Sequence, residues 1–322
     1  MGDSKKVVIL AFNVGLAGFL VNGPGISLRN LLVFSRRFYP NVSFSVFTKF
    51  SVEDNDIDAD FFKIEDKANL MSRIDEADVV HCWSGLKKSF LKELIFADKM
   101  SKPIVLGPNL MDGVNPALEA EFLDKINLSI LLTANPRLKY LLSKLYKIES
   151  SKVTDFMVGP DLEMWKAPKK VDTYILWKGN SRQPVKDIKF AKKVAKILPE
   201  YKFMFLGDKS NYDYIEHIPL ASHARLYINT SWSETKGMAQ LEQMAAGVPS
   251  VVHPQVYCHG KNYVTGIITN KTTECYADAI REILEDGSLR LSLRSGARKY
   301  VEENFGAKQI ADKYYKILNY VS

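Results

Sequence analysis

The chain has 322 residues, of which 46% are hydrophobic and 25% are charged, and its formal net charge is +7. This length suffices for two ordinary domains, and no run of eighteen apolar residues is present that would predict a membrane-spanning helix. The three cysteines (Cys82, Cys258 and Cys275) do not have metal-binding spacing, so we expect reduced thiols in a cytoplasmic protein. The positive charge favours anionic partners, but the sequence contains no nucleic-acid-binding motif.

The first half of the sequence predicts buried strands that alternate with helices. Strands are expected at residues 7–12, 42–48, 78–82, 103–107, 128–133 and 153–158, and helices at 26–38, 87–99 and 136–147. Residues 51–60 are acidic and are expected to form a loop. The short apolar run after Lys5 and Lys6 fits a first strand better than a signal peptide.

A glycine-rich loop at residues 13–25 separates the first strand from the first helix. It does not have the GxGxxG spacing of a dinucleotide site, so such a site is only weakly supported. Gly23 and Gly25 are the candidates for close approach of a ligand, because a glycine backbone carries no side chain. The alternative is that both are ordinary turn glycines.

His81 lies at the end of the strand at 78–82, where open α/β sheets place their ligands. One interpretation is that His81 orients a hydroxyl of a substrate. The other is a structural histidine whose ring is bonded to a nearby carbonyl group.

A group of lysines follows along the chain and includes Lys139, Lys144, Lys147 and Lys152. Such a group could contact an anionic membrane, which leaves a peripheral membrane contact open. A solvated helix face is the simpler interpretation.

The second half repeats the alternation of strands and helices. Strands are expected at 173–177, 202–206, 224–228, 249–252 and 264–268, and helices at 187–198, 238–246, 273–285, 289–304 and 307–320. Arg182 and Lys186 lie in the loop after the first of these strands. A guanidinium fork and a mobile ammonium suit a diphosphate, although a solvated loop is the alternative.

Two glutamates define the most informative stretch. Glu234 lies in a short polar loop, and Glu242 lies inside the helix that follows it. No capping side chain is in register at the start of this helix, and Gly237 and Met238 would leave N–H groups for an anion, with Lys236 adding charge. Carboxylates accept hydrogen bonds from hydroxyls, so the set suits a diphosphate flanked by hydroxyl-rich groups. Two solvated glutamates are the alternative.

This stretch resembles the Glu-x7-Glu element of retaining glycosyltransferases of the GT-B fold, most closely glycosyltransferase family 4. The resemblance is carried by Leu241, Glu242, Met244, Ala245, Gly247 and Pro249. Residues 235–238 depart from it, since Thr-Lys-Gly-Met stands where the family has Gly-Phe-Gly-x. Arg182 and Lys186 resemble the family's Arg-x-x-x-Lys pair, and residues 159–165 resemble its hinge segment.

The resemblance implies two doubly wound Rossmann-like α/β domains that face each other across a cleft. The acceptor-side domain would comprise residues 1–165, and the nucleotide-sugar-binding domain residues 166–305. The helix at 306–322 would pack back toward the first domain. Ligands are expected at the carboxyl ends of the strands.

The implied activity is transfer of a hexose, with retention, from a UDP- or GDP-linked sugar to a hydroxylated acceptor such as a glycan, lipid or protein. Arg182, Lys186, Glu234 and His81 would take part in catalysis. Glu242 would bind the ribose, Ile218 would lie near the base, and the remaining donor-binding residues would be Gly23, Gly25, Lys236, Gly237 and Met238. No metal and no cofactor are implied.

Two other classes of function fit the same pattern. A sugar-nucleotide epimerase or hydrolase would turn over the donor without an acceptor. A non-catalytic protein would bind the nucleotide sugar but transfer nothing, which the altered residues 235–238 would allow.

Overall fold

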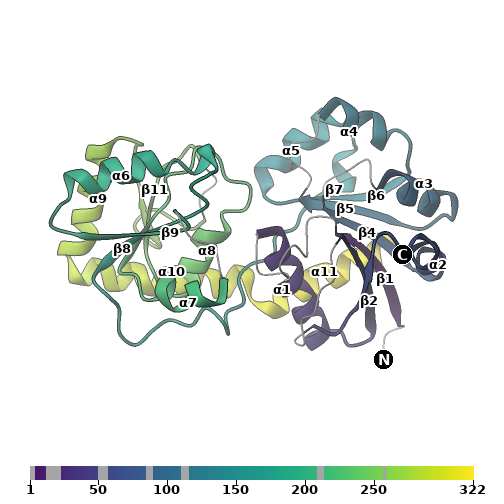
Figure 1. The fold of residues 1–322 in the computed structure, drawn as a ribbon, viewed down its shortest axis with the longest axis horizontal. Coiled ribbons are helices and arrows are strands. Elements are labelled where there is room, and N and C mark those ends of the chain that lie inside the picture. The colour runs from purple at the N-terminus through teal and green to yellow at the C-terminus, as the bar shows by residue number, and fades with distance from the viewer. Residues whose placement is uncertain are drawn as a thin grey trace. The chain divides into compact units, whose positions relative to one another are not determined.

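The computed structural model describes residues 4–11, 23–49, 57–84, 90–109, 116–208, 214–256 and 259–322. The chain divides into two compact units (Figure 1): Met1–Val158 together with Ala307–Ser322, and Gly159–Gly306. No helix in these described ranges is long and apolar enough to cross a membrane.

The first unit is built on a seven-stranded parallel sheet in the order β3-β2-β1-β4-β5-β6-β7. Its strands are β1 (Lys5–Ala11), β2 (Val42–Thr48), β3 (Asp60–Lys63), β4 (Val79–Ser84), β5 (Ile104–Asn109), β6 (Leu128–Thr133) and β7 (Val153–Asp155). Its helices are α1 (Gly23–Phe38), α2 (Lys67–Glu76), α3 (Leu91–Lys99), α4 (Pro116–Leu123), α5 (Pro136–Leu145) and α11 (Ala307–Val321). The near-continuous apolar run of β1 is typical of a parallel strand buried on both faces.

Three elements of this unit, β3, α2 and α4, were not predicted, and α1 starts earlier than expected. The edge strand β3 was not predicted, because all four of its residues are at least partly exposed and show no buried pattern. Helix α2 was not predicted either, although Asp66 caps it by accepting from the Asn69 N–H at 3.2 Å. Helix α1 starts at Gly23 instead of residue 26, since a proline is tolerated in the first helical turn.

The last helix, α11, belongs to the first unit and packs against α1. The Tyr39 ring stacks on Tyr315 at 4.1 Å between centroids, and its hydroxyl donates to Asp312 Oδ1 at 2.6 Å. The Tyr314 hydroxyl lies 2.7 Å from His81 Nδ1 on the central strand β4. The end of the chain is therefore tied to the core of its first domain.

The second unit is built on a five-stranded parallel sheet in the order β12-β11-β10-β8-β9. Its strands are β8 (Tyr174–Lys178), β9 (Lys202–Leu206), β10 (Leu226–Ile228), β11 (Ser250–Val252) and β12 (Gly266–Ile268). Its helices are α6 (Ile188–Ile197), α7 (Tyr214–Ser222), α8 (Met238–Ala245), α9 (Thr273–Glu285) and α10 (Gly287–Phe305). Both units are doubly wound parallel α/β structures, which confirms the predicted fold class.

The division between the units falls earlier than the predicted residue 165. Gly159 packs against Phe305, and a Cβ at Gly159 would lie only 2.5 Å from the Phe305 Cβ. Trp165 is fully buried in the second unit, where its indole N–H donates to the Tyr214 hydroxyl at 2.8 Å. These buried contacts of Gly159 and Trp165 place residues 159–165 in the second domain.

Candidate active site in the second unit

The strand order of the second sheet creates a topological switch point. Strands β8 and β10 are neighbours, while the chain continues from β8 to one edge of the sheet and from β10 to the other. Open α/β sheets bind ligands at such a point, outside the carboxyl ends of the strands. Residues 179–187 follow β8 there, and residues 229–237 follow β10. The candidate site is built from these two loops.

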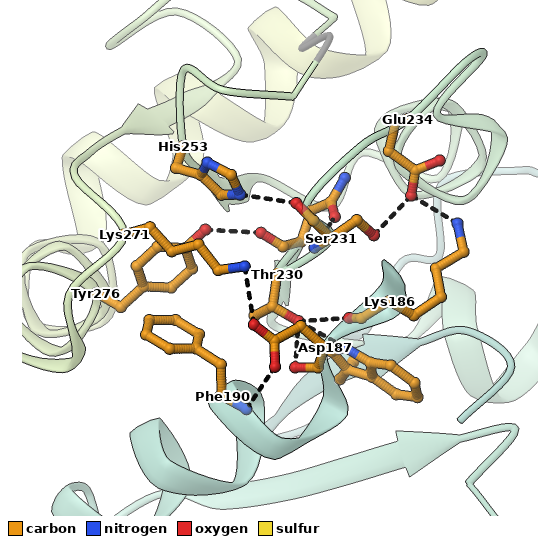
Figure 2. Close-up of polar contacts among 11 residues, drawn as sticks. Lys186, Asp187, Phe190, Thr230, Ser231, Glu234, His253, Lys271 and Tyr276 are labelled. Atoms are coloured by element: carbon orange, nitrogen blue, oxygen red, sulfur yellow. Dashed lines mark hydrogen bonds and ion pairs between the residues drawn. The ribbon is translucent and has the colours of Figure 1, made fainter. Parts of the chain in front are cut away.

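Lys186 and Glu234 meet between the loops (Figure 2). Lys186 Nζ lies 2.6 Å from Glu234 Oε1, and the Ser231 hydroxyl donates to the same oxygen at 2.7 Å. The two charged side chains are 23% and 12% exposed, so the pair is partly shielded but still reachable from solvent. An ammonium has three donors and a carboxylate has further lone pairs, so both groups can bind a ligand while paired.

Hydrogen bonds beneath this pair fix the two loops to each other. The Thr230 hydroxyl accepts from the Trp177 indole N–H at 2.9 Å and lies 3.0 Å from the Lys186 carbonyl oxygen. On the other side, the Tyr276 hydroxyl donates to the Asn229 carbonyl at 2.6 Å. Figure 2 shows the Thr230 contact with Lys186 on one side of the loop and the Tyr276 bond on the other. The site is therefore held by the sheet and by α9, not by its loops alone.

His253 supports the same loop from β11. Its Nε2 lies 2.8 Å from the Ser231 carbonyl oxygen, so this nitrogen carries the proton and donates. Burial lowers the pKa of His253, because desolvation disfavours the charged ring. A neutral His253 therefore fixes the carbonyl group of Ser231, the residue whose hydroxyl donates to Glu234.

Helix α8 begins beside the loop without a side-chain cap. Gly237, the N-cap residue, has φ 60° and ψ 38°, and no side chain caps the helix within the described part of the chain. Its backbone shape is left-handed, which a residue without a Cβ adopts most easily. Lys236 is buried, and its carbonyl accepts from His259 Nε2 at 2.5 Å. Uncapped N–H groups and the helix dipole make this end suited to an anion.

Glu242 is embedded in a network that the sequence did not reveal. Its Oε2 lies 2.7 Å from Lys178 Nζ, and its Oε1 accepts from the Tyr214 hydroxyl at 2.7 Å. The Lys178 ammonium also lies over the Trp165 ring, 4.6 Å from its centroid. The Lys178 and Glu242 side chains are only 2% and 3% exposed. Lys178 directly precedes the loop in which Arg182 and Lys186 were expected to bind a diphosphate. No short sequence pattern links it to Glu242, which lies 64 residues away.

The other predicted site residues of this unit lie at different positions. Arg182 is exposed, and its backbone N–H donates to Asn180 Oδ1 at 3.0 Å. Ile218 is partly buried on α7, and Met238 is the first residue of α8. The structure thus brings Lys186 and Glu234 together, and it leaves the Arg182 side chain in solvent.

Three predicted residues lie in the first unit. Gly23 and Gly25 form the first turn of α1, and a Cβ on Gly23 would meet nothing within 4 Å. Residues 12–22 of the predicted glycine loop lie outside the described residues. His81 is fully buried, and its Nε2 donates to the Gly107 carbonyl at 2.8 Å while Nδ1 accepts from Tyr314.

The environment of His81 argues against its predicted catalytic role. Both ring nitrogens are bonded within the protein, and burial lowers the pKa of the ring to about 4. A neutral ring without a free nitrogen cannot exchange a proton with a substrate. The structural interpretation of His81, which the sequence left open, is the one that its contacts support.

Comparisons with known proteins agree with this architecture. Residues 186–300 match the family model described as Glycosyl transferases group 1, and this segment lies entirely in the second unit. A search of curated protein sequences found no match.

The whole chain is similar to several solved structures. HepE of Anabaena, in a structure with UDP, is 13% identical with a TM-score of 0.73, over 98% of this chain and 99% of that chain. A glycosyltransferase from Rickettsia africae is 15% identical with a TM-score of 0.72, over 99% of each chain. Sucrose-phosphate synthase from Thermosynechococcus elongatus is 13% identical with a TM-score of 0.69, over 98% of each chain.

The fold is therefore that of the GT-B glycosyltransferases. Within this class, the domain match, which begins at Lys186 and includes the whole loop after β10, supports placement in the superfamily that includes the group 1 glycosyl transferases.

Proposed function

We propose that this protein is a retaining glycosyltransferase that moves a sugar from a nucleotide-diphosphate sugar to a hydroxyl acceptor. The observation that carries the proposal is the partly shielded Lys186–Glu234 pair at the carboxyl edge of the second sheet. The group 1 match covers both residues of this pair. HepE, one of the similar structures, has been solved with UDP-glucose, so UDP-glucose is the first donor to test.

Positive charge near the leaving diphosphate is the proposed source of catalysis. Lys186 and the N-terminus of α8 would bind the diphosphate, and exposed Arg182 would close onto it. Charge develops on the diphosphate as the glycosidic bond breaks, so cations placed there stabilise the transition state more than the ground state. Glu234 would accept hydrogen bonds from sugar hydroxyls through the lone pairs that Lys186 and Ser231 leave.

Glu242 is the proposed ribose-binding residue. Lys178 and Tyr214 each occupy one position on its carboxylate. Each carboxylate oxygen has two lone pairs, so one per oxygen is not used by these two contacts, and a ribose hydroxyl would reach it by displacing the groups that leave the side chain only 3% exposed. In this arrangement Lys178 holds the Glu242 carboxylate in place, and the ribose hydroxyl makes a further hydrogen bond to it.

We assign no carboxylate as a covalent nucleophile. Retention would follow from departure of the diphosphate and attack by the acceptor on the same face of the sugar, guided by the phosphate. This part of the proposal rests on the resemblance to glycosyltransferase family 4.

A donor panel tests the proposed function. UDP-glucose, UDP-N-acetylglucosamine and GDP-mannose are each added in a thermal-shift assay, because a bound donor raises the apparent stability by mass action. Replacement of Arg182 by alanine should remove about 3 kcal/mol of transition-state stabilisation, similar to loss of one oxyanion donor. Equal turnover by Arg182→Ala would exclude its role. Donor turnover without an acceptor would instead indicate an epimerase or hydrolase, and binding without any transfer a binding protein.

We also propose a peripheral membrane contact through α5, in a protein of the cytoplasm. Tyr140, Leu141 and Leu145 are exposed on this helix beside the exposed basic residues Arg137 and Lys144. Apolar and basic side chains on one exposed face suit the surface of an anionic bilayer. Leu141→Gln/Leu145→Gln should reduce co-sedimentation with vesicles that contain 30% phosphatidylglycerol, whereas neutral vesicles should bind neither protein. Equal binding of the variant and the parent would exclude α5.

A further inference from the structure

We propose that Trp232 is an aromatic platform that stacks against the apolar face of a pyranose ring at the candidate site. The inference rests on the proposed function and names a ligand contact that the predicted site did not contain. Trp232 is 57% exposed, whereas the other three tryptophans (Trp83, Trp165 and Trp177) are buried. An exposed indole is informative, because burial of so large an apolar ring is strongly favourable and is absent here.

The Trp232 ring is not a freely moving surface side chain. Its backbone N–H donates to the Val185 carbonyl at 2.8 Å, which fixes its peptide against the loop that contains Lys186. The Lys271 ammonium lies 3.3 Å from the ring centroid and is itself paired with Asp187 Oδ2 at 2.9 Å. Figure 2 shows the Lys271–Asp187 pair next to Lys186.

One face of the indole is therefore covered by a cation, and its exposed area belongs to the other face and the ring edges. The Lys271 side chain is only 5% exposed, so the covered face is closed to a ligand. A cation on one face also restricts the ring, which lowers the entropy lost when a ligand stacks on the other face. The result is a single preorganised apolar surface.

The position of Trp232 indicates which part of a ligand it meets. The adjacent Ser231 donates to Glu234, the residue proposed to bind sugar hydroxyls. A pyranose ring carries hydroxyls at its edge and C–H groups on its faces, so a carboxylate and an aromatic ring two residues apart match its two kinds of surface. Trp232 lies two residues from Glu234 in the same loop, and we therefore assign its ring to the sugar instead of the diphosphate.

Acrylamide quenching of tryptophan fluorescence tests this directly, because only Trp232 is open to the quencher. We expect UDP-glucose, or a saccharide such as methyl α-glucoside or maltose, to protect Trp232, while UDP alone does not. Protection by UDP-glucose alone identifies the donor sugar, and protection by the saccharides identifies the acceptor. Equal protection by UDP overturns the proposal, because the ring then stacks on the base. No protection by any of these probes also overturns it.

Variants separate this inference from the proposed function. In calorimetry, Trp232→Leu should raise the Kd of the protecting sugar ligand about tenfold and leave the Kd of UDP unchanged, whereas Trp232→Phe should keep most of the affinity. Tyr320→Leu, which removes an exposed aromatic ring of the first unit, is the matched control and should change neither. An unchanged Kd for the sugar ligand in Trp232→Leu would overturn the aromatic platform. Binding of UDP by this variant would leave the proposed function standing. If UDP and every donor fail to bind, the proposed function fails, and the saccharide measurements still decide the role of Trp232.

Discussion

Lys178 Nζ lies 2.7 Å from Glu242 Oε2, and both side chains are almost completely buried between β8 and α8. The Tyr214 hydroxyl completes the contacts of the carboxylate, and the Trp165 and Tyr214 rings lie against the ammonium at 4.6 and 5.2 Å from their centroids. A buried charge pair of this kind is stable only while both partners are present. It links the segment after the domain boundary, the first strand of the second sheet and the helix of the candidate site.

Removal of one partner of this pair should destabilise the protein strongly. We expect Lys178→Met to lower the free energy of unfolding by about 3–5 kcal/mol, because it leaves Glu242 buried without its counter-charge. The double variant Lys178→Met/Glu242→Gln should recover part of this loss, since no charge then stays buried. Urea unfolding of the parent, both single variants and the double variant gives the coupling free energy. Additive losses in this cycle would contradict the pairing.

Loss of Lys186 should affect activity more than folding. Its ammonium lies at the edge of the sheet and is partly exposed. We expect Lys186→Ala to lower kcat/KM about 100-fold, by the removal of one charge near the departing diphosphate. The matched control is Lys189→Ala, which removes an exposed lysine three residues further along, in α6. Similar kinetics in the two variants would show that charge at Lys186 plays no special part.

The stability of the protein should fall as the pH is lowered from about 6.5 toward 4. Burial lowers the pKa of both His81 and His259 to about 4 from 6.5. The unfolded chain therefore binds protons in this window that the folded chain does not, so unfolding becomes more favourable as pH falls. A shift of this size corresponds to roughly 3 kcal/mol per histidine.

The histidine prediction is checked by urea unfolding at several pH values between 4 and 8. His81→Gln and His259→Gln are expected to lower stability at pH 7 and to flatten its dependence on pH below 6.5. The slope, not the absolute stability, is the diagnostic quantity. An unchanged slope in both variants would assign the acid sensitivity to other groups.

The left-handed backbone of Gly237 should be needed at the start of α8. With φ at 60°, an alanine there is expected to destabilise the fold by about 1–2 kcal/mol, and asparagine by less. Gly237→Ala should also weaken UDP binding, because the strained cap moves the helix N–H groups. Gly287→Ala is the control: its Cβ would meet only the end of the Arg290 side chain at 3.8 Å, in a helix. Thermal unfolding and calorimetry with UDP compare the two.

Activity should persist when divalent cations are removed. In the proposed site, Lys186, Arg182 and the N-terminus of α8 provide the positive charge that Mg²⁺ provides in other phosphoryl-containing sites. We therefore expect transfer rates within about twofold in 5 mM EDTA and in 5 mM MgCl₂. A large loss of rate in EDTA, restored by Mg²⁺, would reverse this expectation.

Much of the fold could be predicted because its signals are local. The bounds of β2, β6, β9 and α9 agree with the expected ranges to the residue. The missed elements have weak local patterns: β3 is a four-residue edge strand, α2 buries only Leu70 and Ile74, α4 has only eight residues, and α7 has Pro219 inside it. Such elements are stabilised by contacts with the rest of the domain, and the hydrophobic periodicity of their own short sequences does not contain these contacts.

The candidate site was predicted in its parts but not in its contacts. Lys186 and Glu234 were both expected near a ligand, yet only the structure pairs them, across 48 residues of sequence. No role was predicted for Trp232 or Lys271, because neither residue belongs to a recognisable sequence motif and the exposure of Trp232 is known only from the structure. For His81 the sequence left a catalytic and a structural interpretation open, and its contacts support the structural one, through a partner, Tyr314, that lies 233 residues away.

By itself, the sequence determined two parallel α/β units and the loops in which charged residues could meet a ligand, because strand periodicity, glycines and prolines act within a few residues. The tertiary structure decided which charges are partners. Strand β10 pairs with β11 on one side but with β8, not with the preceding strand β9, on the other, which brings the Lys178 end of β8 close to Glu242 of α8. That strand order follows from the packing of the whole sheet, and no short stretch of sequence contains it.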